Sequence, residues 1–321
     1  MKILLKRTAA ILAVLFVTAV GVSSAPAAAH SGPALQTPGT TLQQALSCTS
    51  GLSKATKTPI LLVHGTFTTP SETWTWGYQR ALSAKGHPVC TVTLPQRATI
   101  DMQTTVEYVV HAIREINDVS GREVSIIGHS QGGVLPTWAL RFWPDLPDRV
   151  DDFVALAGPQ NGTGFADALC APSRCPDLMH QMVTGSKWMT ALRRQSLDSS
   201  VSFTSIGSNS DEVVFPAPIA TNFPGATNLL VQDVCPARVV GHIGMLSDAA
   251  TFALVIDALT HTGPANETRV SRSVCLHSDY PGIDYAGRSS LLATGIAGLT
   301  AFATLPHTSH EPALRDYAVT G

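Results

Sequence analysis

The residue of this sequence best suited to chemistry is a serine. Ser130 lies at the centre of GHSQG, residues 128–132, which matches the pattern Gly-x-Ser-x-Gly. So short a pattern also arises by chance, but here a β-branched run precedes it and a helical stretch follows it. That setting is typical of a tight strand-to-helix turn that lifts a serine hydroxyl clear of a sheet. We therefore predict that Ser130 is a nucleophile for acyl transfer.

A nucleophilic serine needs a base, normally a histidine that a carboxylate holds in one tautomer. Where this turn occurs, the acid and then the histidine follow the serine along the chain. We expect His242 to be the base, because it lies between a predicted strand and a predicted helix. His261, just past a helix end, is its rival. We expect Asp211, which follows a predicted strand, to be the acid, with Glu212 and Asp233 as rivals.

Acyl transfer also needs hydrogen-bond donors for the developing oxyanion. They are typically the amide after the nucleophile and a group from the loop after an earlier strand. These positions correspond to Gln131 and to Thr66, which ends the segment HGT at 64–66. We find no dinucleotide fingerprint, phosphate loop or metal-ligand spacing, so we expect neither a cofactor nor a metal.

The elements that must position these residues alternate between strands and helices. Helical spacing of apolar residues predicts one helix that Gly121 ends, and Ser247 is the expected N-cap of another. Predicted strands span 59–63, 87–92, 123–127, 152–157, 201–206 and 228–234, and predicted helices span 104–120, 132–143 and 247–259. Residues 187–194 form a helical or irregular stretch between two of the strands. This alternation predicts an α/β fold with a mainly parallel sheet and helices on both faces.

The first 29 residues have the pattern of a secretory signal peptide. Three basic residues precede an apolar run at 9–20 and the small residues of Ala27–Ala29. The run is too short to cross a bilayer core of roughly 30 Å. We expect cleavage near Ala29, a secreted protein, and a single domain over 30–321.

Charge and cysteines narrow the class further. The sequence has 21 Lys and Arg residues, three of them in the leader, against 23 Asp and Glu residues. This balance excludes the basic surface that a nucleic-acid-binding protein needs. All six cysteines follow the leader, and an even number outside the cytoplasm favours disulfides. Fifteen pairings are open. A disulfide between Cys170 and Cys175 would close a short local loop. Disulfides between Cys48 and Cys90 and between Cys235 and Cys275 would each close a loop of about 40 residues. Buried free thiols are the alternative.

Four segments carry a resemblance to a known family. They are ILLVHGT at 60–66, SQGG at 130–133, SDEVV at 210–214 and HIGMLS at 242–247. Together they resemble the family of Candida antarctica lipase B and its bacterial relatives, over about residues 48–275. The resemblance implies an α/β-hydrolase fold, an esterase or lipase reaction, disulfides Cys48–Cys90 and Cys235–Cys275, and donation by Thr66 through both backbone and side chain.

The sequence departs from that family around the pocket. His129 stands where the yeast enzyme has tryptophan, His64 replaces a proline, and Phe67 replaces a glycine. Gln160 aligns with a polar position of the acyl pocket, so we expect His129 and Gln160 to contact substrate. Residues 166–189, with Cys170 and Cys175, align with a mobile entrance region. The C-terminal disulfide of the family is absent.

The expected partner is an ester or lipid substrate, such as a triacylglycerol. The apolar run at 291–305 is too short and too interrupted for a membrane span, so we expect a core or entrance helix, with transient contact to a lipid interface as the alternative. We expect a monomer. A cutinase-like polyester depolymerase, an acyltransferase and a non-catalytic secreted scaffold remain open as other classes.

Overall fold

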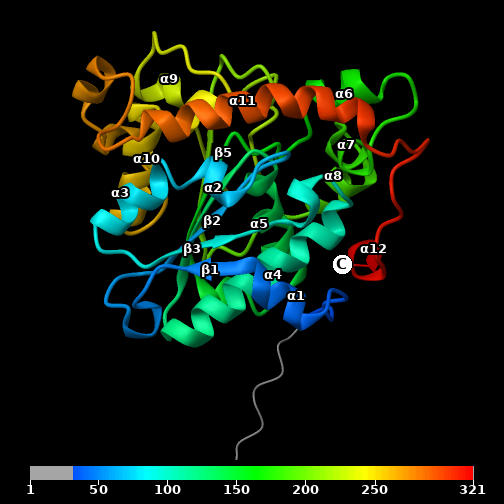
Figure 1. The fold of residues 1–321 in the computed structure, drawn as a ribbon, viewed down its shortest axis with the longest axis horizontal. Helices are drawn as coiled ribbons and strands as arrows, with labels where there is room; N and C mark the ends of the chain where they lie inside the picture. Colours follow the sequence, from blue (N-terminus) through cyan, green and yellow to red (C-terminus); the bar gives the residue numbers. More distant parts are fainter. Residues whose placement is uncertain (1–31, 321) are drawn as a thin grey trace, which may run out of the picture. The chain divides into compact units, whose positions relative to one another are not determined.

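A single mixed sheet organises the part of the chain described by this computed structural model, residues 32–320; the predicted signal peptide lies outside it. The strand order is β1-β3-β2-β4-β5-β6-β7 (Figure 1). The strands are β1 Leu46–Cys48, β2 Ile60–Val63, β3 Val89–Val92, β4 Val124–His129, β5 Val150–Leu156, β6 Ser202–Gly207 and β7 Thr227–Leu230. Only β1 is antiparallel to its neighbour, so the predicted mainly parallel α/β sheet is confirmed.

Helices cover both faces of this sheet. One core joins the sheet to α1, α4, α5 and α8, and a second joins the opposite face to α3 and α10. The helices are α1 Gly39–Ala45, α2 Pro70–Thr73, α3 Tyr78–Ala84, α4 Met102–Ser120, α5 Gln131–Phe142, α6 Gly164–Cys170, α7 Asp177–Met182, α8 Lys187–Leu192, α9 Val231–Val234, α10 Ala249–Thr260, α11 Tyr285–Ala301 and α12 Asp316–Thr320. Helix α4 ends at Gly121, whose φ of 64° gives the left-handed cap expected there.

The central strands are buried on both faces, which explains their continuous apolar sequences. Every residue of β2 and β4 is buried. Their parallel register pairs Val63 with Gly128, so both strands reach the same edge of the sheet together. The loops that carry Thr66 and Ser130 therefore begin side by side.

Two predicted boundaries were wrong. The strand predicted over 228–234 ends at Leu230, because the Asp233 carboxylate accepts the Leu230 N–H at 2.7 Å and starts helix α9. Helix α10 is capped by Asp248 rather than Ser247, since the Asp248 carboxylate accepts the Thr251 N–H at 2.7 Å. Helix α1 and strand β1 precede the first element that the sequence predicted, the strand at 59–63.

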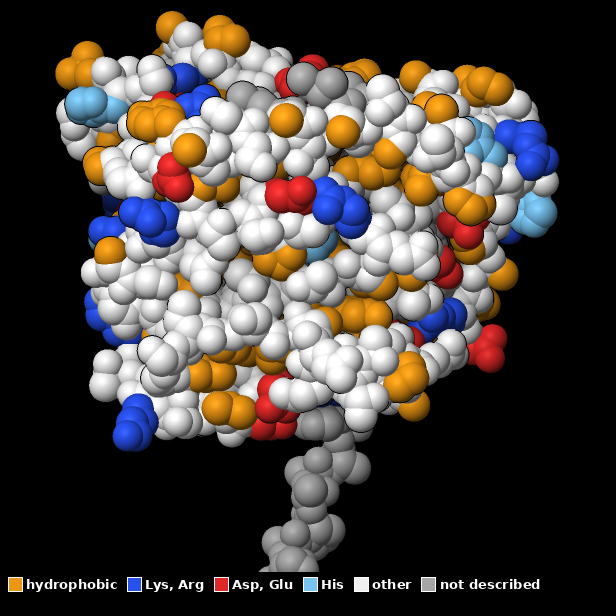
Figure 2. All heavy atoms as spheres, in the orientation of Figure 1, with side chains coloured by type: hydrophobic (Ala, Val, Ile, Leu, Met, Phe, Trp, Pro, Cys, Tyr) orange, Lys and Arg blue, Asp and Glu red, His pale blue; other side chains and the backbone are white. Residues whose placement is uncertain are grey.

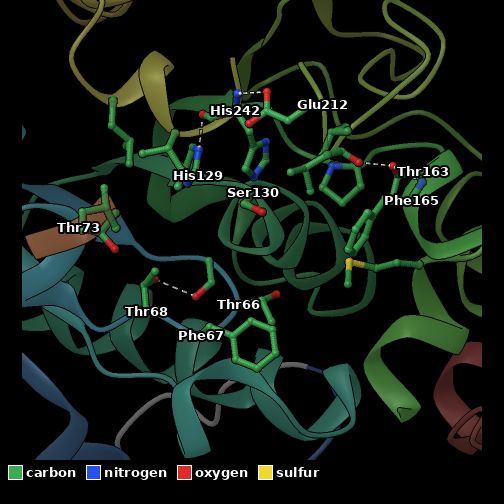
Figure 3. Close-up of a pocket in the computed structure, with 18 of the residues that line it drawn as sticks. Thr66, Phe67, Thr68, Thr73, His129, Ser130, Thr163, Phe165, Glu212 and His242 are labelled. Carbon is green, nitrogen blue, oxygen red and sulfur yellow. Dashed lines mark hydrogen bonds between the residues drawn. The ribbon is translucent and has the colours of Figure 1, made fainter. Parts of the chain in front are cut away.

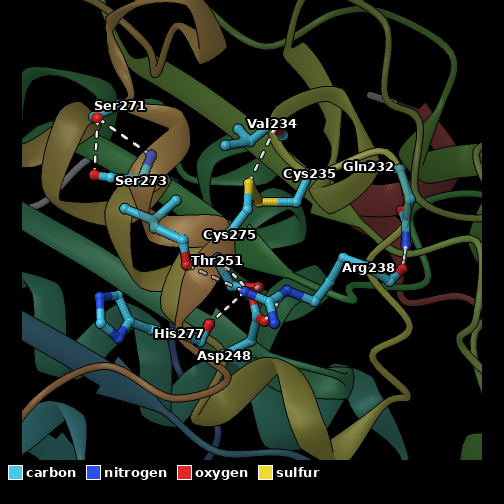
Figure 4. The surroundings of a disulfide bond; sticks show 11 residues. Gln232, Val234, Cys235, Arg238, Asp248, Thr251, Ser271, Ser273, Cys275 and His277 are labelled. Atoms are coloured by element: carbon cyan, nitrogen blue, oxygen red, sulfur yellow. Dashed lines mark hydrogen bonds and ion pairs between the residues drawn. A yellow bond between two sulfur atoms is a disulfide. The ribbon is translucent and has the colours of Figure 1, made fainter.

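Three disulfides lie within the described residues. They are Cys48–Cys90, Cys170–Cys175 and Cys235–Cys275. The third joins the segment after α9 to the 3-10 helix η6, Arg272–Leu276, beside an ion pair of 3.1 Å between Arg238 and Asp248 (Figure 4). This cross-link fixes the base of the loop that carries His242.

Helix α11 lies across the top of the molecule, over the edge of the sheet where the parallel strands end (Figure 1). It continues into the 3-10 helix η7, Phe302–Thr304, and the chain then runs to α12. Within residues 32–320, no helix is long and apolar enough to cross a membrane. On the face drawn in Figure 2, basic and acidic side chains are interspersed among hydrophobic and uncharged ones.

Candidate active site

Ser130 forms the whole connection between strand β4 and helix α5. Its φ of 58° lies in the left-handed region, which is strained for a residue with a side chain. Two backbone hydrogen bonds hold it there: Ser130 N–H donates to Leu156 O at 2.9 Å, and Gly133 N–H donates to Ser130 O at 2.8 Å. The turn thus keeps its strained shape and presents the hydroxyl at the edge of the sheet.

Three glycines make this turn sterically possible. A Cβ on Gly128 would lie 1.9 Å from Gly132 O, and one on Gly132 would lie 2.3 Å from Val63 O. A Cβ on Gly65 would lie 2.7 Å from the Cβ of Ser130. The glycines of the GHSQG motif therefore serve close backbone approach, and Gly65 lets the neighbouring loop pack directly against the serine.

His242 and Asp211 form a buried hydrogen-bonded pair. Nδ1 of His242 donates to the two carboxylate oxygens of Asp211 at 2.9 and 3.1 Å. Asp211 lies in the loop after β6, and one of its oxygens accepts the N–H groups of Val213 and Val214, both at 2.8 Å. Burial alone would raise the pKa of Asp211, but the imidazole and these N–H groups outweigh it and lower that pKa. The carboxylate therefore stays ionised and fixes the histidine tautomer.

Ser130 and His242 face each other in the same cavity. Figure 3 shows the Ser130 side chain directly below the imidazole of His242, and both residues line the pocket. Because Nδ1 is bonded to Asp211, the lone pair of the imidazole is on Nε2. No hydrogen bond joins the two side chains here; in such sites this bond often tightens only when substrate binds.

The two expected oxyanion donors also meet at this point. Thr66 follows β2 and lines the cavity, and its Oγ1 donates to Oε1 of Gln131 at 3.3 Å. Gln131 is the first residue of α5, and the first N–H groups of a helix have no partner within the helix. The loop after β2 and the N-terminus of α5 thus meet next to Ser130.

His64 braces the loop that carries Thr66. Its Nδ1 donates to Gly65 O at 2.9 Å, and its Nε2 accepts the Leu94 N–H at 3.0 Å. Burial lowers the pKa of His64 to about 4, so the ring is neutral near pH 7. It is not among the residues that line the cavity.

His129 does line the cavity, and it also contacts the candidate base. Its Nε2 donates to the backbone O of His242 at 3.0 Å, and the two ring centroids are 4.7 Å apart. Burial, followed by the proximity of His242, lowers the pKa of His129 to about 3. Glu212 completes the arrangement by accepting the His242 N–H at 3.0 Å, so the His242 backbone is held at both ends.

The cavity above these groups has a volume of about 550 Å³. Helix α11 and η7 line it through Leu291 and Phe302, from the apolar run for which the sequence predicted a core or entrance helix. Its other apolar side chains come from six further segments: Phe67, Pro159, Phe165, Met179, Met182, Val213, Val214, Ile243 and Leu246. An apolar chain of several carbons fits these walls better than a charged group.

The structure assigns other roles to several residues that the sequence had suggested. Gln160 is fully buried and is not among the residues that line the cavity. Its amide donates to Gly133 O at 2.7 Å and accepts from Thr137 at 2.9 Å, so contact with substrate is not supported. Asp233 accepts the Leu230 N–H at the start of α9, and the carboxylate bonded to His242 Nδ1 is that of Asp211. His261 bonds to Asp257 O at the end of α10.

Among the described residues, Cys170, Cys175 and His180 form a group of three potential metal ligands whose ligand atoms all lie within 4.8 Å of one another. Both sulfur atoms belong to one disulfide and offer no thiolate. This grouping therefore does not form a metal site.

This chain is similar in sequence and in fold to known hydrolases. A sequence model of the alpha/beta hydrolase family matches residues 60–316. Lipase B of Pseudozyma antarctica is 29% identical over 299 residues, which cover 90% of this chain and 87% of that protein. The crystal structure of Aspergillus fumigatus lipase B has a TM-score of 0.82 at 27% identity and covers 94% of this chain and 75% of that one. The similarity thus includes the sheet and the loops that carry the site.

Proposed function

Because this chain belongs to the alpha/beta hydrolase family, we propose that it is a lipase-type hydrolase of carboxylic esters with Ser130 as its nucleophile. The observation that carries the proposal is the buried Asp211–His242 pair, which faces Ser130 in an apolar cavity. The two similar proteins, both named lipase B, support an ester as the substrate.

In the proposed reaction, Ser130 Oγ forms a bond to the ester carbonyl carbon while its proton passes to Nε2 of His242. Asp211 stabilises the resulting imidazolium. The tetrahedral intermediate collapses, the alcohol leaves with that proton, and the acyl group remains on Oγ. Water then attacks with His242 again as base, and a carboxylic acid is released as the proton returns to Ser130.

Thr66 and Gln131 supply the donors for the oxyanion in this proposal. Their backbone N–H groups come from the loop after β2 and the first turn of α5, next to Ser130. The Thr66 hydroxyl now points to Gln131, and rotation about its Cβ–Oγ1 bond would direct it to the substrate oxygen. Loss of one such donor typically costs about 10² to 10³ in rate.

We also propose that the chain is exported and that residues 30–321 form the mature single domain. Three disulfides favour an oxidising compartment. The N-terminal sequence of protein recovered from culture medium tests this. A start near His30 is expected, and a start at Met1 would contradict it.

The function is tested by initial rates on p-nitrophenyl esters of short and long acyl chains, with and without an emulsified lipid. We expect Ser130→Ala to abolish hydrolysis, while Ser199→Ala, at an exposed serine, retains it. Full activity of Ser130→Ala would overturn the proposal. Products distinguish the alternatives: free acid indicates a hydrolase, and a new ester formed with an added alcohol indicates an acyltransferase.

A further inference from the structure

The residue after Thr66 has an unfavourable backbone conformation. Phe67 has a φ of 64°, in the left-handed region that a bulky side chain rarely adopts. Such a conformation persists only where the surrounding structure holds it. Because Thr66 and Phe67 share a peptide group, a shift of the Phe67 backbone also moves Thr66, which carries the proposed donors.

The group that holds Phe67 is Arg97, in the 3-10 helix η2, Pro95–Ala98. Phe67 N–H donates to Arg97 O at 2.8 Å, and Nε of Arg97 donates to Phe67 O at 2.7 Å. Arg97 itself has a φ of 59°, so two strained segments stabilise each other. The Arg97 side chain thus bonds to the peptide group between Phe67 and Thr68.

Glu72 orients this guanidinium. Its Oε2 accepts from Nη2 of Arg97 at 2.7 Å and from Thr69 N–H at 2.8 Å, within the capping box that starts α2. Its Oε1 accepts from Thr294 of helix α11 at 3.1 Å. The Arg97 fork is therefore fixed at both ends, by Phe67 O and by the Glu72 carboxylate.

We propose that Arg97 is a positioning residue for the oxyanion donors: it keeps the Phe67 peptide in its strained conformation and so aims Thr66 at the reacting carbonyl. This proposal rests on the proposed function, because Thr66 is the donor there. Arg97 does not line the cavity, and its side chain is 43% exposed, so its removal costs little packing. Its effect passes through Phe67.

The first test compares Arg97→Ala and Arg97→Lys with the parent on a soluble ester. We expect kcat to fall roughly ten- to a hundredfold in both variants, below the full loss of an oxyanion donor, with KM changed less than about threefold. Lysine keeps the charge but lacks the planar fork that joins Phe67 O to Glu72. Recovery in Arg97→Lys would show a long-range charge effect and overturn the positioning role.

A matched control is Arg122→Ala. Arg122 is exposed and donates its Nε to Ala55 O at 2.7 Å, the same kind of bond as that of Arg97 but far from the site. We expect its kcat to equal that of the parent. Thermal unfolding of every variant separates a change in the site from a loss of folded protein.

The sharper test places Arg97→Ala in two backgrounds. Phe67→Ala removes the ring but keeps the strained φ, whereas Phe67→Gly removes both the ring and the strain, since glycine adopts this φ freely. We expect Arg97→Ala to lower kcat as strongly in the Phe67→Ala background as in the parent. In the Phe67→Gly background we expect a loss of only about two- to threefold. Equal losses in both backgrounds, or no loss in the parent, would overturn the proposal.

Failure of the proposed function would look different. If Ser130→Ala kept full activity, the assignment of the nucleophile would be wrong, whatever Arg97 does. If Thr66→Ala kept full activity, the Thr66 hydroxyl would not be a donor, and only the Thr66 backbone N–H would remain in that role. If both variants lose activity while Arg97→Ala keeps it, the function stands and only the positioning role fails.

Discussion

Gly65 offers a direct test of how tightly the site is built. A Cβ at this position would lie 2.7 Å from the Cβ of Ser130, 3.1 Å from His129 O and 3.3 Å from Ser130 Oγ. Gly65 does not have a positive φ, so alanine fits its backbone without strain. The substitution Gly65→Ala therefore tests steric contact with the nucleophile and little else.

The size of the effect follows from these distances. Ordinary contact of a Cβ begins at 3.4 Å, so the loop or the serine must move by about 0.7 Å. Ser130 is held by two backbone hydrogen bonds, and the loop carries Thr66, so either movement disturbs the reacting geometry. A displacement near 1 Å costs about 10²-fold in rate, or roughly 2.7 kcal/mol of activation free energy. We expect kcat to fall by about this factor, with KM far less affected.

The assay is initial-rate hydrolysis of a short p-nitrophenyl ester, beside thermal unfolding. Gly39→Ala is the matched control, because Gly39 is exposed at the start of α1 and a Cβ there meets nothing within 4 Å. A Gly65→Ala enzyme that unfolds at the parental temperature and keeps the parental kcat would refute the reasoning.

Three further predictions concern charge. Asp211→Asn should lower kcat by about 10⁴-fold with little loss of folded protein, because the His242 tautomer is no longer fixed while the acceptor for the Val213 and Val214 N–H groups remains; steady-state rates check this. Burial lowers the pKa of His64 to about 4 and of His129 to about 3, so below pH 6.5 the unfolded chain takes up protons that the folded chain does not. The free energy of unfolding should fall by up to roughly 3 kcal/mol per histidine between pH 6.5 and 4. In urea titrations over this pH range, the free energy of unfolding of His129→Gln should fall less than that of the parent. Burial raises the pKa of Asp152 to about 8, so the folded protein loses stability as pH rises from about 4 to 8. Asp152→Asn should therefore have a higher melting temperature than the parent at pH 8 and the same melting temperature at pH 4. Equal melting temperatures of variant and parent at both pH values would contradict this.

Much of this protein is encoded in short stretches of sequence. The apolar runs and the glycine after α4 predicted the central strands and that helix, because burial on both faces of a parallel sheet and a left-handed cap are local requirements. The α/β-hydrolase fold and the resemblance to the lipase B family were confirmed. The catalytic roles of Ser130, Asp211 and His242 stay predictions until they are tested, as does the monomeric state.

Other features could not be predicted because they depend on contacts between distant segments. Phe67 and Phe302 pack with ring centroids 4.4 Å apart although 235 positions separate them, and this contact brings the C-terminal cover onto the site. The sequence marked Gln160 as a pocket residue, but its direction is set by Thr137 and Gly133 on helix α5. Neither the direction of the Gln160 side chain nor the position of the C-terminal segment over the site follows from local sequence periodicity.

The chain order of serine, acid and histidine and the glycines around Ser130 were determined by the sequence itself, since the turn requires those residue types wherever it occurs. The tertiary structure alone decided that Phe67 is strained and that Arg97, 30 positions later, holds it. A φ angle and a bond between two loops exist only after β2 and β3 pair and bring those loops together.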